Sequence, residues 1–213
     1  MRKVRANVLE TALNMVKAGL VVAKEGNVSA RVPGERRIAI TPSRHPYELM
    51  KVSDILIVDF DEKVVLGKRK PSTETKMHIA IFKARSDVGA VLHTHSPYAS
   101  ALSCVNGTKI PPLMDEQTIY LGGDVGATPY AVAGSAEIAA NASNALLHRD
   151  ATLLSNHGTI CCGRSLDAAL RNAILVEKLA QVYLLARSIG EVASVPPETI
   201  EQQSRRYLSA RQT

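Results

Sequence analysis

Hydrophobic residues recur every three to four positions in some stretches of this chain and cluster in short runs in others. The helical spacing predicts helices over residues 4 to about 24, from 72 or 73 to about 85, from 97 onward, over 135–148, from 166 to about 189, and from 196 or 197 onward. Short apolar runs between turn residues predict strands in 27–32, 36–41, 54–60, 63–67, from 90 and, as a pair joined by a turn, in 151–162. Residues 109–130 follow neither pattern, and an irregular segment is expected there.

The order of these elements indicates the fold class. Strands come in adjacent pairs and helices lie between the pairs, which favours an α/β protein with a mixed, largely antiparallel sheet covered by helices. A chain of 213 residues can bury its own core without disulfides or metal. We therefore expect one domain over residues 1–213.

Composition narrows the classes of partner. The formal net charge is +6, but the basic residues are scattered and aromatic residues make up only 4%, so a base-stacking surface for nucleic acid is not expected. No apolar stretch approaches the roughly 18 residues of a membrane span, and no secretory leader is evident. Three cysteines, two of them the neighbours Cys161 and Cys162, fit small core residues in a reducing compartment. These features predict a cytoplasmic protein.

Candidate metal ligands occur at the ends of two predicted strands. His93 and His95 end the apolar run "AVLHTH", and a side-chain period of two places them on one face. His157 follows the next apolar run, and Gly158 is expected to allow a tight turn there. Three neutral imidazoles with an open position are typical of catalytic zinc, although ordinary hydrogen-bonded histidines have the same pattern. The remaining histidines, His45, His78 and His148, are interpreted as surface or packing residues.

A second group of polar residues lies at predicted turns. Hydroxyls, an amide and free backbone N–H groups at a helix start are what a phosphate dianion needs, and each of these residue types also serves as an ordinary cap. The group consists of Gly26, Asn27, Thr41, Ser43, Ser72 and Thr73.

Five segments together resemble the class II aldolase and adducin family, and most of all its fuculose-phosphate aldolases. They are "GNVSARV", "ITPSRHPYE", "PSTETKMH", "AVLHTHSPYASALS" and "LLSNHGTICC", in the family order and at close to the family spacing. The resemblance implies a single αβα domain and one zinc ion per subunit, held by His93, His95 and His157. It also implies a C4 homotetramer with active sites between subunits.

The same resemblance assigns roles to the polar residues. Gly26, Asn27, Ser43, Ser72 and Thr73 align with a phosphate-binding pocket, and Glu74 aligns with the catalytic carboxylate. Zinc would stabilise the negative charge that develops when the C3–C4 bond of a ketose 1-phosphate breaks, and Glu74 would carry the proton at the carbon. Without the resemblance, Glu74 reads as a first-turn helix residue that complements the helix dipole.

Three positions bear on the substrate. Arg44 stands where the family usually has glycine, and it either adds a contact to phosphate or fills the pocket. Asp115, with Glu116 beside it, lies near a position where the fuculose-phosphate enzymes have tyrosine, whereas the related epimerases use an aspartate and the related dehydratases a glutamate in this region. Tyr207 falls where the aldolases have a C-terminal tyrosine that reaches a neighbouring subunit as proton donor, and a packing role fits it equally.

The leading hypothesis is therefore a zinc-dependent aldolase that releases dihydroxyacetone phosphate from a ketose 1-phosphate similar to L-fuculose 1-phosphate. Its rivals are a sugar-phosphate 4-epimerase and a methylthioribulose-1-phosphate aldolase or dehydratase. By the resemblance, the epimerases have aspartate at the position of Glu74, which favours the aldolase. A non-catalytic adducin-like module is a third class, and the presence of all three histidines argues against it. A nucleic-acid-binding protein, suggested only by the basic charge, is remote.

Overall fold

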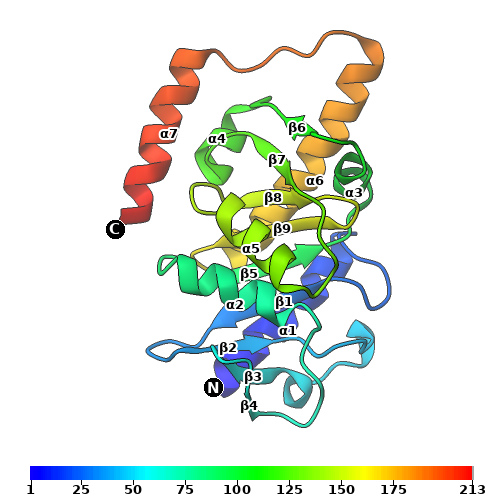
Figure 1. The fold of residues 1–213 in the computed structure, drawn as a ribbon, viewed down its shortest axis with the longest axis vertical. Coiled ribbons are helices and arrows are strands. Elements are labelled where there is room, and N and C mark those ends of the chain that lie inside the picture. Colours follow the sequence, from blue (N-terminus) through cyan, green and yellow to red (C-terminus); the bar gives the residue numbers. More distant parts are fainter. Residues whose placement is uncertain (213) are drawn as a thin grey trace.

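The computed structural model describes residues 1–212, whose ribbon is drawn in Figure 1. The α-helices of the described chain are α1 (Arg2–Lys17), α2 (Thr75–Ala84), α3 (Pro97–Ser103), α4 (Asp115–Leu121), α5 (Ala136–Ala145), α6 (Leu166–Ile189) and α7 (Pro197–Gln212). Its strands are β1 (Asn27–Arg31), β2 (Arg37–Ile40), β3 (Leu56–Asp59), β4 (Val64–Leu66), β5 (Ala90–Thr94), β6 (Lys109–Ile110), β7 (Val125–Thr128), β8 (Ala151–Leu154) and β9 (Gly158–Gly163). Two single-turn 3-10 helices, Tyr47–Leu49 and Val52–Asp54, connect β2 to β3.

One sheet contains all the strands of the described chain, in the order β4-β3-β2-β1-β5-β9-β8-β7-β6. Neighbouring strands are antiparallel except β7 and β8, which are parallel. The prediction of a mixed, largely antiparallel sheet is confirmed. In its centre, His93 of β5 lies opposite Asn27 of β1 on one side and opposite Ile160 of β9 on the other.

The sheet has a hydrophobic core on each face, because successive side chains of a strand point to opposite sides. Leu92 and Cys161 belong to the core that α1, α3 and α6 cover, whereas Val91 and Cys162 belong to the core that α2 and α5 cover. Helices accordingly flank the sheet on both sides in Figure 1, which confirms the αβα arrangement. Both cysteines are buried and free, as core residues should be.

The end of the first helix was predicted wrongly. Helix α1 ends at Lys17 rather than near residue 24, because Gly19 adopts a left-handed conformation with φ of +71°. The backbone N–H of Leu20 donates to the carbonyl of Met15 and that of Gly19 to Val16, which is the Schellman pattern of a helix terminus. The chain then runs as a loop to Gly26, directly before β1, so this glycine does not end the helix.

The segment 109–130 is more regular than predicted. It contains the two-residue strand β6, the two-turn helix α4 and strand β7, each too short to show a period in the sequence. Helix α2 begins at Thr75, two to three residues later than expected, after a turn over Thr73 and Glu74. The long helix α6 has the predicted bounds.

Helix α7 lies apart from the other covering helices. In Figure 1 an extended segment leads from the end of α6 to α7, which packs against α4. Gln203 and Tyr207 are buried in this contact. None of the helices in residues 1–212 combines the length and the apolar character that a membrane crossing requires.

Candidate active site

Four segments meet where β5 ends and β1 and β9 begin. The start of β1 supplies Asn27, the end of β5 supplies His93, and the turn between β8 and β9 supplies His157. The residue that directly precedes α2 is Glu74, the fourth contribution. Because β1 and β9 both run antiparallel to β5, their first residues converge on its last ones.

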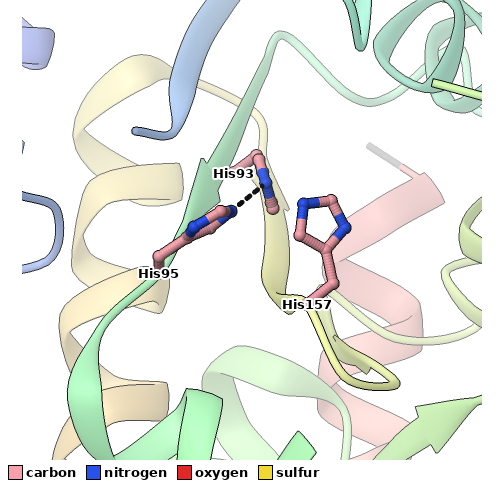
Figure 2. Close-up of side chains that lie close together, drawn as sticks. All are labelled: His93, His95 and His157. Atoms are coloured by element: carbon pink, nitrogen blue, oxygen red, sulfur yellow. Dashed lines mark hydrogen bonds between the residues drawn. The ribbon is translucent and has the colours of Figure 1, made fainter. Parts of the chain in front are cut away.

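The three histidines form a cluster, shown in Figure 2. Ring centroids lie 4.7 Å apart between His93 and His95, 4.7 Å between His93 and His157, and 4.9 Å between His95 and His157. One ring nitrogen from each residue lies within 4.8 Å of the others. The structure therefore brings together the three residues that the sequence pointed to, with His93 inside the strand and His95 just past its end.

The turn that carries His157 differs from the predicted one. Asn156, not Gly158, takes the left-handed conformation, with φ of +56°. Gly158 is needed for a different reason, since a Cβ there would lie 2.4 Å from the carbonyl oxygen of Thr94 and 2.9 Å from the ring of His95. The missing side chain lets β9 approach β5 closely enough for the rings to meet.

The donor set of the cluster suits a divalent metal. Nδ1 of His93 donates to the carbonyl of Thr159 at 2.9 Å, so Nε2 is the nitrogen that faces the other rings. Nε2 of His95 lies 2.8 Å from it. Burial, with the neighbouring His93 and His157, lowers the pKa of His95 to about 4, and burial also lowers the pKa of His157. Two neutral imidazoles and a backbone-oriented third are the ligands that zinc prefers.

Glu74 lies beside these three imidazoles. Its buried carboxylate lies 3.1 Å from Nε2 of His93 and 3.4 Å from Nε2 of His157, and Oε2 accepts a hydrogen bond of 2.8 Å from the amide of Asn27. Burial lowers and Glu74 raises the pKa of His93, and the net shift is upward, so the carboxylate favours positive charge at this point. Three imidazoles around a carboxylate thus form a site that fits a divalent cation.

The orientation of Glu74 distinguishes the two roles expected of it, a helix-start residue that complements the helix dipole and a carboxylate of the site. It precedes the first residue of α2, yet its side chain makes no capping bond to that helix. Burial would raise the pKa of Glu74, but the electrostatic effect of His93, with smaller ones from His157 and Asn27, holds it well below the ordinary value. Its Oε1 atom is buried without a hydrogen-bond partner among the described residues. Such a carboxylate is aimed at the cluster and has one oxygen free for a ligand.

The predicted phosphate-binding residues lie beside Glu74. Pro42 and Pro71 form an isolated bridge, and the N–H of Ser43 donates to the carbonyl of Lys70 at 2.9 Å, so the two polar turns lie side by side. The hydroxyl of Ser72 accepts from the N–H of Glu74, while Thr73 is exposed.

Two further residues of the predicted pocket have other surroundings. Arg44 is exposed and has a φ of +55°, a left-handed conformation that glycine adopts more readily than arginine. Gly26, with φ of +69°, accommodates the carbonyl of His93, which a Cβ would approach to 2.6 Å. Its own carbonyl accepts from the hydroxyl of Tyr47.

Asp115 and Tyr207 lie away from the cluster of their own chain. Asp115 accepts from the amide of Gln203 at 2.6 Å, so it belongs to the contact between α4 and α7. Tyr207 lines a cavity of about 510 Å³ together with Gly163, which is at the opposite end of β9 from His157. The role expected of Tyr207 concerns the site of a neighbouring subunit, so its place within one chain leaves that expectation a prediction.

His78 is a site residue that the sequence interpretation undervalued. It is fully buried and joined to Asn27 and to Ser29, whose hydroxyl lies 2.6 Å from its Nδ1. Its position four residues after Glu74 places both on one face of α2, and this spacing was the available signal.

The comparisons with known proteins agree with this geometry. Residues 6–184 match the model of the "Class II Aldolase and Adducin N-terminal domain". The chain belongs to the class II aldolase and adducin family. A 5-deoxy-D-ribulose 1-phosphate aldolase of Bacillus thuringiensis is 31% identical over 97% of this chain and 96% of its own. A 5-methylthioribulose-1-phosphate/5-deoxyribulose-1-phosphate aldolase of Rhodospirillum rubrum is 36% identical over 93% of this chain and 88% of its own.

A solved L-fuculose 1-phosphate aldolase structure superimposes with a TM-score of 0.91 at 32% identity, covering 97% of this chain and 96% of that one. The predicted family and fold are therefore confirmed. These relatives share the class and differ in the named sugar.

Proposed function

We propose that this protein is a zinc-dependent class II aldolase that cleaves a ketose 1-phosphate to dihydroxyacetone phosphate and an aldehyde. The observation that carries the proposal is the buried carboxylate of Glu74, turned away from its helix and toward His93 and His157. A purely structural first-turn glutamate would instead face the backbone N–H groups or the solvent.

The reaction requires a group that takes the proton of the C4 hydroxyl, a group that supplies a proton at C3, and stabilisation of the negative charge that develops between these steps. Cleavage removes the proton of the C4 hydroxyl, breaks the C3–C4 bond, and leaves its electron pair on the fragment that carries the phosphate. A proton must then be added at C3 to give dihydroxyacetone phosphate. Zinc held by His93, His95 and His157 would act as a Lewis acid that stabilises the developing negative charge on the substrate oxygens.

The residues of the chain would divide the other tasks. Glu74 carries the proton at C3, because its Oε1 atom is within the cluster and makes no other hydrogen bond among the described residues. The hydroxyls of Ser43, Ser72 and Thr73, with Asn27 and Gly26 nearby, would hold the phosphate dianion. The amide group of Asn27 already donates one hydrogen bond to the carboxylate of Glu74, so its main contact is with Glu74 and not with phosphate.

We further propose a C4 homotetramer in which Tyr207 of a neighbouring subunit donates a proton to the aldehyde oxygen in the synthetic direction. Tyr207 lies at the far end of β9 from its own cluster, so within one chain it has no route to the substrate. Burial, with Asp150 adding to it, raises the pKa of its phenol, which keeps the proton available for donation. A cytoplasmic location fits the family membership and the three free cysteines of the described residues.

A substrate panel tests the proposal. Purified zinc-loaded protein is incubated with L-fuculose 1-phosphate, 5-deoxyribulose 1-phosphate, methylthioribulose 1-phosphate and L-ribulose 5-phosphate, and the products are read by NMR. An aldolase forms dihydroxyacetone phosphate from one or more of the 1-phosphates. Epimerised pentose phosphate or loss of water from methylthioribulose 1-phosphate would instead favour the alternatives that Asp115 and Glu116 suggest.

A further inference from the structure

A buried row of polar side chains leads from Glu74 to the middle of β1. His78 lies one helical turn after Glu74, and its two ring nitrogens contact Asn27 and Ser29. Asn27 and Ser29 are two residues apart on β1, so they share the face that α2 covers. Ser29 and His78 are fully buried, and Asn27 and Glu74 are only 4% and 7% exposed.

The hydrogen bonds of this row can run in one direction only. An ionised carboxylate accepts and cannot donate, so the Nδ2 amide of Asn27 must face Oε2 of Glu74, which lies 2.8 Å away. The amide oxygen of Asn27 then faces His78 and requires a proton on its Nε2 atom. Nδ1 of His78 is left as the acceptor for the hydroxyl of Ser29 at 2.6 Å.

The charge state of His78 agrees with this direction. Burial lowers the pKa of His78 to about 3, so the ring is neutral and carries one proton. In the neutral ring one nitrogen donates and the other accepts, which is what the row from Ser29 to Glu74 uses. Each side chain thereby fixes the orientation of the next one.

We propose that His78 and Ser29 are positioning residues for the catalytic carboxylate. They fix the amide of Asn27, which holds Oε2 of Glu74 and leaves Oε1 as the oxygen that exchanges the proton with substrate. This inference rests on the proposed function only for the identity of that proton transfer. The orientation itself follows from the hydrogen bonds of the described residues.

The alternative is that His78 simply fills space between α2 and β1. A space-filling residue could be replaced by leucine with little effect on the distant carboxylate. A positioning residue could not, because without the Nε2–H donor the Asn27 amide loses the partner that sets its direction. Misplacement of a reacting group by about 1 Å costs roughly 100-fold in rate.

The experiment compares His78→Leu with His78→Gln in the zinc-loaded enzyme. The glutamine amide can still donate to the oxygen of Asn27, whereas leucine cannot. We expect His78→Leu to lower kcat by about 10- to 100-fold with KM changed less than about twofold, and His78→Gln to recover kcat to within about threefold of wild type. His148→Leu, at an exposed histidine elsewhere, is the matched control and should keep the wild-type kcat.

Equal losses in the leucine and glutamine variants, or no loss in either, would overturn the proposal. Zinc content and unfolding temperature are measured on every variant, so that a misfolded protein is not counted. Ser29→Ala should lower kcat less than His78→Leu, and an unchanged kcat would remove Ser29 from the row.

Crystal structures of both variants provide a readout that does not depend on turnover. In His78→Leu the Asn27 amide and the Glu74 carboxylate should shift or occupy more than one position, and in His78→Gln they should stay in place. If the wild-type enzyme cleaves no ketose 1-phosphate, the proposed function fails while these structures still decide the positioning role. Unmoved side chains in His78→Leu would overturn it.

Discussion

Replacing Arg44 by glycine should raise the stability of the protein and weaken its hold on the substrate at the same time. Arg44 has a left-handed backbone, with φ of +55°, in the turn after Ser43. The exposed side chain follows a residue of the proposed phosphate pocket. The single substitution therefore removes both an unfavourable conformation and a positive charge.

The change in stability comes from the backbone conformation of residue 44, and the change in KM comes from the lost contact with phosphate. A left-handed conformation costs an L-residue about 1–2 kcal/mol, and glycine loses about 0.5–1 kcal/mol through its more flexible unfolded state. The difference is a gain of about 0.5–1 kcal/mol, or a rise in Tm of about 1–4 °C for a chain of this size. A charge-assisted contact to phosphate contributes about 1.5–3 kcal/mol, and its loss at an exposed site should raise KM roughly tenfold.

Arg44→Ala is the matched control, because it removes the charge and keeps the left-handed backbone. Both variants should show the same rise in KM for a phosphorylated ketose and no change for its dephosphorylated form, while only Arg44→Gly should gain stability. Calorimetry and steady-state kinetics measure the two effects. A lower KM in Arg44→Gly would show that Arg44 obstructs the phosphate site, and equal Tm values for the two variants would refute the conformational argument.

Three further predictions concern the interior of the site. Glu74→Gln should keep zinc and substrate binding while kcat falls about 100-fold or more, and near wild-type turnover would make Glu74 a structural residue. Chelation should abolish activity while far-UV circular dichroism stays unchanged, because the two cores do not depend on the cluster; unfolding on chelation would contradict this. The unfolded chain protonates His78 below about pH 6.5, whereas the folded chain does so only near pH 3. As the pH is lowered through that window, the free energy of unfolding should therefore decrease by up to about 1.4 kcal/mol per pH unit. Urea titrations from pH 7 to pH 4 should show a shallower fall in His78→Gln, and identical slopes would contradict the buried neutral ring.

The parts of the fold that the sequence predicted are those with a long or a strict period. Helix α6 was placed with its observed bounds, and β5 was recognised by an apolar run that ends in His93. Strand β6 and helix α4 were missed, since two and seven residues are too few for a period to emerge and their form depends on pairing with β7 and packing on α7. Local pattern is informative only where it repeats.

The site shows the same division. The three histidines were singled out from short motifs and Glu74 from the family resemblance, and the strand order brings the histidines together. The role of Gly158 could not be inferred, because the reason for it is the carbonyl of Thr94 on another strand. His78 was missed for the same reason, since its partners Ser29 and Asn27 lie about fifty residues earlier in the chain.

The most direct test of the central claim is a zinc titration of the chelator-treated enzyme. The rate of dihydroxyacetone phosphate release from the best ketose 1-phosphate is measured as zinc is added in fractions of one equivalent per chain. The account predicts no release without zinc, a linear rise, and a break at one equivalent, because His93, His95 and His157 form one ligand set per chain. Full activity in the metal-free enzyme, or no dihydroxyacetone phosphate at any zinc level, would contradict it.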